Sequence, residues 1–193
     1  MQAATMVFLC WAKPSLQEQE DCRNKADGFN YDSKYRGATS KHVSSLNELS
    51  KDGFLINHAR VLVGSGAETY EKGKLALENW RSTPIRSGVK FCVCVKEFLP
   101  WVMMPLQIVY VNESRSSKKD MASFCRYPSS HLLAGEERFS IEIDEKNQVW
   151  YEVLSFSKPA HFLSFIGYPY VQLRQKFFAH QSSNAVMKHL SGS

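Results

Sequence analysis

Apolar and polar residues alternate along several stretches of the chain, and a period of two residues is typical of β-strands with one buried face. The stretches with this pattern are residues 54–63, 89–95, 106–111, 139–143 and 149–154. The last two are joined by residues 144–147, which read Asp-Glu-Lys-Asn and favour a turn. We therefore predict that residues 139–154 form an antiparallel hairpin.

Three other regions show the spacing of amphipathic helices. The first follows the turn at residues 64–66, and its apolar face carries Tyr70, Gly73, Leu77 and Trp80. Gly73 would let this helix lie close to the surface that it covers. Pro159 and Pro169 each suit the first turn of a further helix. The helix after Pro169 is expected to continue to residue 190, with a polar interruption at residues 181–184 that marks a kink or a frayed segment.

The order of these elements is strand, helix, a run of antiparallel strands and a long C-terminal helix, which predicts an α+β fold. We expect one antiparallel curved sheet in a helix-grip-like arrangement, in which the sheet curls around the C-terminal helix. Residues 29–190 would form a single domain, preceded by an N-terminal extension at residues 1–28 with a short helix after Pro14.

A sheet that curls around a helix can leave an apolar cavity between the two. The residues expected to line this cavity are Phe91, Ile108, Tyr151, Leu173 and Phe177. They would bind a lipid or another small apolar or amphipathic ligand. If the sheet instead packs flat on its helices, the same residues fill a solid core, because protein interiors are normally close-packed. The sequence pattern leaves both alternatives open.

The composition indicates a folded and mildly basic protein. Of its 193 residues 44% are hydrophobic, and 24 Lys and Arg against 19 Asp and Glu give a formal net charge of +5. This excess favours anionic partners such as phospholipid headgroups or nucleic acid. We expect no nucleic acid, because residues 115–119 are the only dense basic run. The aromatic-rich residues 98–104 and 162–170 are candidates for peripheral contact with a membrane, and no apolar stretch reaches the roughly 20 residues of a membrane-spanning helix.

The chain carries no recognisable catalytic motif. Cys92 and Cys94 lie on one face of a predicted strand, but no second pair of ligands completes a zinc site. Glu142 and Glu152 lie on neighbouring predicted strands, where they form either an acid–base pair or exposed carboxylates opposite Lys or Arg. His131 has no Gly-x-Ser-x-Gly element to complete a nucleophilic triad. We therefore expect no enzyme, no catalytic residue, no bound metal and no cofactor.

Four sequence motifs occur in order along the chain. They are Tyr31 with residues 37–39 (Gly-Ala-Thr), residues 57–66 (Asn-His-Ala-Arg-Val-Leu-Val-Gly-Ser-Gly), residues 135–139 (Gly-Glu-Glu-Arg-Phe), and residues 149–152 (Val-Trp-Tyr-Glu) with residues 155–159 (Ser-Phe-Ser-Lys-Pro). Together they resemble the uncharacterised protein family 0548, which is found in bacteria and plants. The resemblance extends from about residue 28 to residue 189. It departs from the family pattern near residues 81–88, where the family has a longer stretch, and near residues 121–131.

The resemblance implies no established enzyme. Similarity to plant members of the family implies a location at the plastid outer envelope, or on its cytoplasmic face, and a proposed cation-channel activity. The odd number of five cysteines and the lack of a signal segment predict reduced thiols in a cytosol-like compartment, so a cytoplasmic location is the alternative. We thus expect a non-enzymatic protein that binds an apolar or amphipathic ligand, with a chloroplast outer-envelope protein that contributes to cation-channel activity as the alternative. The oligomeric state stays open.

Overall fold

The computed structural model describes residues 9–25, 29–78, 85–96, 100–116, 119–126, 133–160 and 165–192. Its strands are β1 (Leu9–Cys10), β2 (Leu55–Ser65), β3 (Lys90–Lys96), β4 (Trp101–Ser116), β5 (Lys119–Arg126), β6 (Leu133–Ile143) and β7 (Gln148–Pro159). Its helices are α1 (Leu16–Lys25), α2 (Asn47–Lys51), α3 (Ala67–Glu78) and α5 (Tyr168–Ser191), with the short 3₁₀-helices η1 (Ser33–Tyr35), η2 (Ala38–Ser40) and η3 (Val43–Leu46). Trp80, which was predicted on the apolar face of a helix, and His131, which was considered as a catalytic histidine, lie outside the described residues.

The strands form one antiparallel sheet in the order β1-β4-β5-β6-β7-β2, and β3 pairs with β4 outside this path. β6 and β7 are the predicted hairpin, with Ile141 opposite Tyr151. β2 is the first long strand and pairs with the last one, β7, so that Arg60 lies opposite Glu152. The α+β class with an antiparallel sheet and a long C-terminal helix is thus confirmed, and the helix-grip arrangement stays a prediction.

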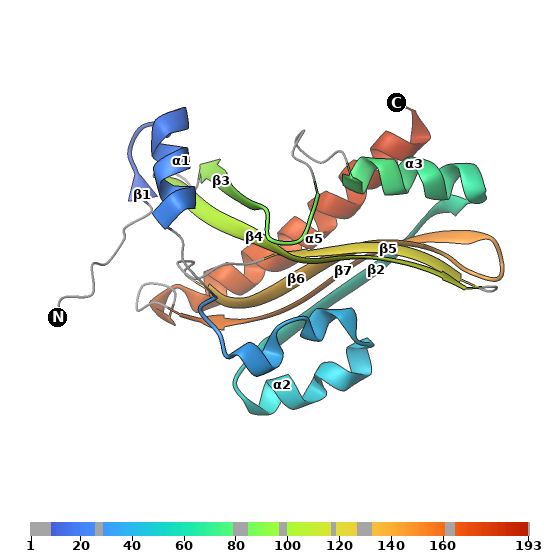
Figure 1. The fold of residues 1–193 in the computed structure, drawn as a ribbon, viewed down its shortest axis with the longest axis horizontal. Helices are drawn as coiled ribbons and strands as arrows, with labels where there is room; N and C mark the ends of the chain where they lie inside the picture. The colour runs from blue at the N-terminus through green and yellow to red at the C-terminus, as the bar shows by residue number, and fades with distance from the viewer. Residues whose placement is uncertain are drawn as a thin grey trace.

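α3 and α5 cover one face of the sheet (Figure 1). The buried core on this face consists of Tyr70, Leu77, Phe139, Ile141, Val149, Tyr151, Val153 and Val186. A Cβ atom on Gly73 would lie 2.9 Å from the Cδ1 atom of Ile141. The glycine therefore lets α3 lie close to β6, as the sequence predicted.

The segment from residue 29 to residue 54 covers the opposite face, where Figure 1 shows α2 on the other side of the sheet from α3. Its core consists of Tyr31, Leu46, Leu49, Phe54, Ala134, Leu154 and Phe156. The rings of Phe54 and Phe156 meet edge to face at 5.2 Å. β6 and most of β7 are consequently buried on both faces, so polar side chains on these strands lie inside the protein.

β1 and α1 form a smaller lobe with β3 and the first half of β4 (Figure 1). Its core is small, with Val93 and Leu106 buried and Phe91, Val95 and Met104 packed against them. The predicted helix after Pro14 is α1, which begins at Leu16. Residues 9–25 of the predicted N-terminal extension thus pack on the sheet.

The start of one predicted helix and the break predicted within another are wrong. Pro159 does not open a helix, because it is the last residue of β7 and pairs with Leu133. Residues 165–166 are helical and Gly167 follows as a turn, whereas residues 161–164 of that predicted helix lie outside the described residues. α5 also runs without interruption through residues 181–184, because the two serines there are buried and hydrogen-bonded. The Ser182 and Tyr151 hydroxyls lie 2.6 Å apart, and the Ser183 hydroxyl donates to the Ala179 carbonyl at 2.9 Å. Within the described residues, no helix combines the length and the apolar character needed to cross a membrane.

Candidate functional site

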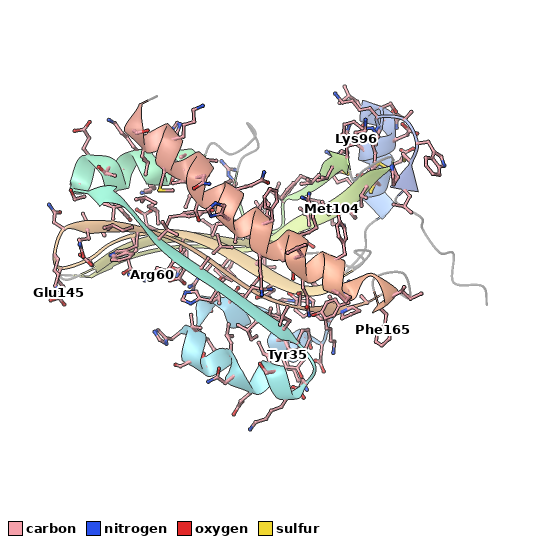
Figure 2. The ribbon with its side chains drawn as sticks, turned by 180° about the vertical axis from the view of Figure 1, so that it is seen from behind. Tyr35, Arg60, Lys96, Met104, Glu145 and Phe165 are labelled. Atoms are coloured by element: carbon pink, nitrogen blue, oxygen red, sulfur yellow. The ribbon has the colours of Figure 1, made fainter. Side chains whose placement is uncertain are left out.

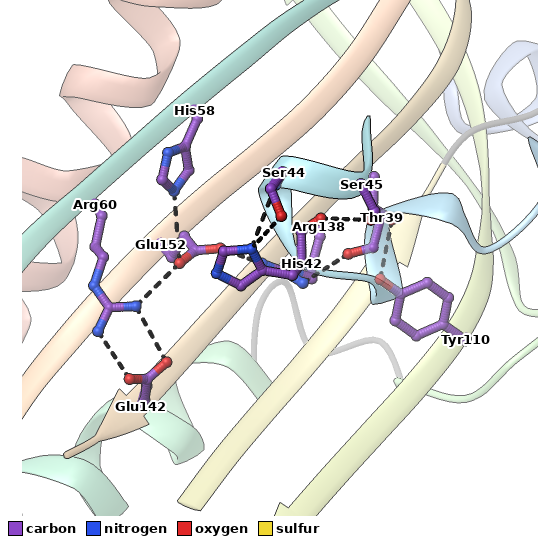
Figure 3. A network of polar contacts seen from close by, with 10 residues as sticks. All are labelled: Thr39, His42, Ser44, Ser45, His58, Arg60, Tyr110, Arg138, Glu142 and Glu152. Atoms are coloured by element: carbon purple, nitrogen blue, oxygen red, sulfur yellow. Dashed lines mark hydrogen bonds and ion pairs between the residues drawn. The ribbon is translucent and has the colours of Figure 1, made fainter. Parts of the chain in front are cut away.

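Polar side chains gather on the face of β6 and β7 that residues 29–54 cover, and Figure 3 shows all of them except Glu136. We call them the polar network, and they are His58 and Arg60 of β2, Glu136, Arg138 and Glu142 of β6, and Glu152 of β7. The four network residues on β6 and β7 are at most 7% exposed. All of them except Glu142 come from the four sequence motifs that carry the family resemblance. Segments that are distant in the sequence therefore meet at this place.

Glu136 holds the covering segment onto the sheet. Its side chain is fully buried, and its carboxylate accepts hydrogen bonds from the Tyr31 hydroxyl and the Gly37 amide, both at 2.6 Å. Thr39 adds a hydroxyl donor at 3.0 Å and an amide donor at 3.3 Å. A buried carboxylate is costly unless such donors surround it. The first motif thus supplies the partners that the third motif requires.

Arg138 links the segment around Thr39 to the neighbouring strand β7. It donates to the Thr39 carbonyl at 2.6 Å and forms an ion pair with Glu152. Its side chain is 7% exposed, and among the described residues its Nε atom has no hydrogen-bond partner. Because the guanidinium is charged at any physiological pH, Glu152 is what compensates this charge within the protein.

Arg60 lies at the solvent-exposed edge of the polar network. Its guanidinium bonds both oxygens of Glu142 at 2.8 and 3.2 Å, contacts Glu152 at 3.3 Å and stacks 4.9 Å over the Trp150 ring. The hydrogen bond to Glu142 raises the pKa of Arg60 above its ordinary value. The His58 Nε2 atom lies 3.6 Å from the second oxygen of Glu152. The side chains of His58 and Arg60 are about one-third exposed, at 35% and 32%.

This geometry changes the interpretation of Glu142 and Glu152. The sequence left them as an acid–base pair or as exposed carboxylates opposite basic residues. They do lie around a shared arginine, but both are buried rather than exposed. A general acid or base must exchange its proton with a substrate, whereas the oxygens of Glu152 are engaged by Arg138 and Arg60. The arrangement is suited to fixing strand register and the covering segment.

The five residues predicted to line one cavity lie in different environments. Tyr151 is fully buried in the core beneath α3 and α5, whereas Ile108 is buried in β4. Phe91 packs in the small core of β3 and β4. Leu173 and Phe177 are 64% and 47% exposed, so the prediction that they face the interior is wrong. The cause is that α5 turns a different face to the sheet.

The face of α5 that contacts the sheet is partly polar. Gln175 bonds the Ser157 hydroxyl at 3.0 Å and lies 3.2 Å from the side-chain amide of Asn57. At about 100° per residue, Tyr170, Leu173 and Phe177 point roughly opposite to Gln175 and lie within an arc of about 60°. The large apolar residues on and just before this outward face are Phe165 (73% exposed), Ile166 (65%), Tyr170 (40%), Leu173 (64%) and Phe177 (47%). We call these five residues the apolar ridge.

Figure 2 shows α5 lying in front of the sheet, with Phe165 near its N-terminal end. The charge of this helix has one sign. α5 contains no Asp or Glu, and it carries Arg174, Lys176 and Lys188. The Arg174 guanidinium lies 5.7 Å from the Phe177 ring, and thus next to the apolar ridge. The outward surface of α5 therefore combines apolar side chains with positive charge only.

Cys92 and Cys94 lie on one face of β3, as predicted, and their sulfur atoms are 4.0 Å apart. Within the part of the chain that the structure describes, no group of three or more His, Cys, Asp or Glu residues is arranged to hold a metal ion.

Comparison with known proteins agrees with the four motifs. Residues 37–185 match a domain of unknown function, DUF1990. A UPF0548 protein of Arabidopsis thaliana is 59% identical over 206 residues, which cover 97% of this chain and 100% of that protein. UPF0548 proteins of Dictyostelium discoideum (26% identity, 94% of this chain and 95% of that protein) and Deinococcus radiodurans (29% identity, 68% and 76%) are also similar.

The alignment with the Arabidopsis protein spans 206 positions, whereas this chain has 193 residues. The plant relative therefore contains residues that this chain lacks. The match to the domain covers well over half of the chain, and it includes the entire polar network. The chain is thus a member of the UPF0548 family, whose domain has no known function.

Proposed function

We propose that this protein binds the surface of an anionic membrane through the apolar ridge of α5. The observation that carries this proposal is the exposure of five large apolar side chains along one helix face and the residues just before it. An amphipathic helix that lies in the membrane interface presents such a face to the lipid and places basic residues beside it. The ridge would enter the headgroup region while the remainder of the domain stays in water.

Charge favours a lipid surface over other occupants of the apolar ridge. α5 has no acidic residue, and the whole chain has a formal net charge of +5. Arg174 and Lys176 on α5 would meet anionic headgroups without repulsion from a carboxylate on the same helix. A ligand in the protein interior is less well supported, because Tyr151 and Ile108 are buried in separate parts of the sheet from the exposed Leu173 and Phe177.

The ridge supports reversible binding. Full burial of a Leu, Ile or Phe side chain contributes about 1.5–3 kcal/mol, so the exposed half of each ridge residue contributes about 1 kcal/mol. Five residues give roughly 5 kcal/mol, and each basic residue near an anionic surface adds about 1 kcal/mol. This sum corresponds to an effective dissociation constant between about a micromolar and a millimolar.

Vesicle flotation of the full chain tests the proposal. We expect it to float with vesicles that contain about a third anionic phospholipid at low salt, and to stay in solution with neutral phosphatidylcholine vesicles. The variant with Leu173→Ser and Phe177→Ser should bind roughly 30-fold more weakly, because it loses about 2 kcal/mol of apolar transfer. Leu75→Ser is the matched control, because Leu75 is 52% exposed on α3 and outside the ridge.

Two results would reject the proposal. The first is that the wild-type chain does not associate with anionic vesicles at low salt. The second is that the double variant and Leu75→Ser bind equally well. If the double variant instead changes the mass of the protein measured by sedimentation equilibrium, the ridge is an interface between protein chains and does not bind lipid.

The membrane that the family resemblance implies is the plastid outer envelope, and we propose it as the site of action. Imaging of the tagged chain in plant cells tests this location, and a diffuse cytoplasmic signal would contradict it. Cation-channel activity stays a separate prediction, which current recordings in planar bilayers would test. The ridge would then serve attachment, so the double variant should lower the number of channel events by lowering membrane recruitment.

A further inference from the structure

The exposed face of α5 changes character midway along the helix. A helix turns by about 100° per residue, so His180 lies within about 20° of the line through Leu173, and Asn184 lies within about 20° of the line through Phe177. The apolar ridge ends at Phe177, and polar residues continue its face. The exposed positions beyond the ridge are His180, Gln181, Asn184, Ala185, Lys188 and His189.

Lys188 lies in line with the apolar ridge at the far end of the helix. It follows Tyr170 by 18 residues, which is five full turns or roughly 27 Å of helix. Its side chain is exposed, and α5 contains no carboxylate that would neutralise its charge. The exposed face thus consists of an apolar half, which ends at Phe177, and a polar half, which ends with positive charge at Lys188.

The neighbour of the polar half disfavours membrane contact along the whole length of α5. Val186 packs with Tyr70 and Leu77 of α3, and Figure 1 shows the C-terminal end of α5 next to α3. α3 carries three glutamates against two lysines, and all three glutamates are exposed. An anionic membrane that lay flat along α5 would approach these carboxylates, whereas a membrane that is closest to the N-terminal half of the helix would stay farther from them.

We propose that α5 meets the membrane at a tilt, with the apolar ridge among the acyl chains and Lys188 on the phosphates of anionic headgroups. This inference rests on the proposed membrane binding, to which it adds an orientation and a headgroup contact. Interfacial helices bury their apolar face by about 5–10 Å. Over the roughly 27 Å between Tyr170 and Lys188, this depth corresponds to a tilt of about 10–20°. At that tilt the Lys188 ammonium stays at the membrane surface, where it can donate hydrogen bonds to phosphate oxygens.

Depth-dependent fluorescence quenching tests the orientation. A fluorescent amino acid is introduced by stop-codon suppression at one exposed position of the full chain at a time, namely Leu173, Asn184 or Lys188. Each labelled chain is bound to vesicles that contain anionic phospholipid and carry a quencher either on the acyl chains or on the headgroups. We expect the acyl-chain quencher to act mainly on the label at position 173. The labels at positions 184 and 188 should respond mainly to the headgroup quencher.

Replacing Lys188 by glutamine tests the headgroup contact. Lys188→Gln should bind anionic vesicles roughly fivefold more weakly, which corresponds to about 1 kcal/mol for one basic residue near the surface. Lys51→Gln is the matched control, because it removes the same charge from α2 on the opposite face of the sheet. At about 0.1 M salt this distant charge is screened, so the control should change binding by less than about twofold. Since a basic residue in the last turn also stabilises a helix, circular dichroism verifies that both variants are folded.

Equal acyl-chain quenching at positions 173 and 184, or deeper insertion at position 188 than at position 173, would overturn the tilt while membrane binding itself stands. Equal binding by Lys188→Gln and Lys51→Gln would overturn the headgroup contact. If the wild-type chain stays in solution with anionic vesicles, the proposed membrane binding fails and this inference fails with it.

Discussion

Replacing Glu152 by glutamine would remove the carboxylate on which the polar network converges. The substitution keeps the size of the side chain and one carbonyl oxygen but deletes the charge. Arg138, whose side chain is 7% exposed, would lose the carboxylate that compensates it, and its Nε atom already has no partner among the described residues. Arg60 would keep its two hydrogen bonds to Glu142 at 2.8 and 3.2 Å. The loss of folding stability in Glu152→Gln should therefore come from the unpaired charge of Arg138.

The burial of the pair sets the expected magnitude. Removing one partner of a buried ion pair costs about 3–5 kcal/mol, because the remaining charge is neither paired nor hydrated. For a chain of this size each kcal/mol lowers the melting temperature by about 2–4 °C, so Glu152→Gln should lower it by roughly 6–20 °C. An exposed ion pair is worth at most about 1 kcal/mol. The Glu20–Arg23 pair on α1, whose side chains are 52% and 39% exposed, provides this comparison.

Urea unfolding, monitored by circular dichroism, measures the cost of losing the buried ion pair and the cost of losing the exposed one. The free energy of unfolding is compared for the wild type, Glu152→Gln and the matched control Glu20→Gln. Arg138→Gln and the double variant with Glu152→Gln complete a mutant cycle, in which the double variant should cost clearly less than the sum of the two single variants. If Glu152→Gln costs no more than Glu20→Gln, or if the cycle is additive, the ion pair does not hold the strands together as we argue.

Two further predictions concern β6 and the turn that follows it. Gly135→Ala should cost about 3 kcal/mol or more, because φ at Gly135 is +151° and a Cβ atom would lie 1.9 Å from the Phe156 carbonyl oxygen. Gly53 provides the control, because its φ is +81° but nothing lies within 4 Å of an added Cβ atom, so Gly53→Ala should cost only about 1 kcal/mol in the same urea assay. If the two variants lose the same free energy of unfolding, the predicted clash at Gly135 is wrong. Asp144→Asn should lower stability at pH 7, because hydrogen bonds from Trp150, then Gln148 and Lys146, hold the Asp144 pKa below its ordinary value. This stabilisation is complete above the unfolded-state pKa of about 3.9 and is lost as the pH falls through the lower folded-state pKa, so the difference between wild type and variant should shrink below about pH 4; a difference independent of pH would contradict it.

Strands with a regular alternation could be predicted from the sequence, and those without it could not. Parts of β2, β6 and β7 alternate β-branched or aromatic residues with polar ones, and strands occur at each of these places. β6 nevertheless begins six residues before the predicted stretch, and β7 continues to Pro159. β5 reads Lys-Asp-Met-Ala-Ser-Phe-Cys-Arg, which contains no β-branched residue and only weak alternation. Its place in the sheet is set by pairing with β4 and β6 on either side. Such pairing is a property of the assembled sheet that local pattern does not report.

The polar network was beyond prediction for a different reason. Glu136 and Arg138 occupy alternate positions of β6, and a polar alternate face normally indicates contact with solvent. Here the irregular segment of residues 29–54, with its short 3₁₀-helices, covers that face. Nothing in its spacing predicts a covering layer, because 3₁₀-helices and loops have no periodic apolar stripe. The motifs identified the participating segments, but the contacts between them emerged only from the fold.

α5 shows that periodicity alone does not indicate which side of a helix is buried. Tyr170, Leu173 and Phe177 have the spacing of a core-facing stripe, and we predicted an interior position for two of them. The buried face includes Ser182 and Ser183, which become compatible with the core by hydrogen-bonding to Tyr151 and Ala179. The sequence of α5 also places apolar residues such as Val186 on its other side, and this second apolar stripe was the signal that could have indicated which side is buried. The exposed stripe is the surface through which we propose that the protein binds a membrane.

The polar network and the apolar ridge lie on opposite sides of the sheet, and this separation leads to a final prediction. Odd-numbered residues of β7 such as Ser157 face α5, whereas Glu152 faces the segment of residues 29–54. Glu152→Gln should therefore leave vesicle binding unchanged at temperatures where the variant is folded, although it lowers stability. None of the ridge residues belongs to the four motifs, so the proposal of lipid binding rests on the exposed surface of α5 and not on the family resemblance. If Glu152→Gln abolishes flotation while circular dichroism shows a folded protein, the network is part of the membrane site and the two must be treated as one.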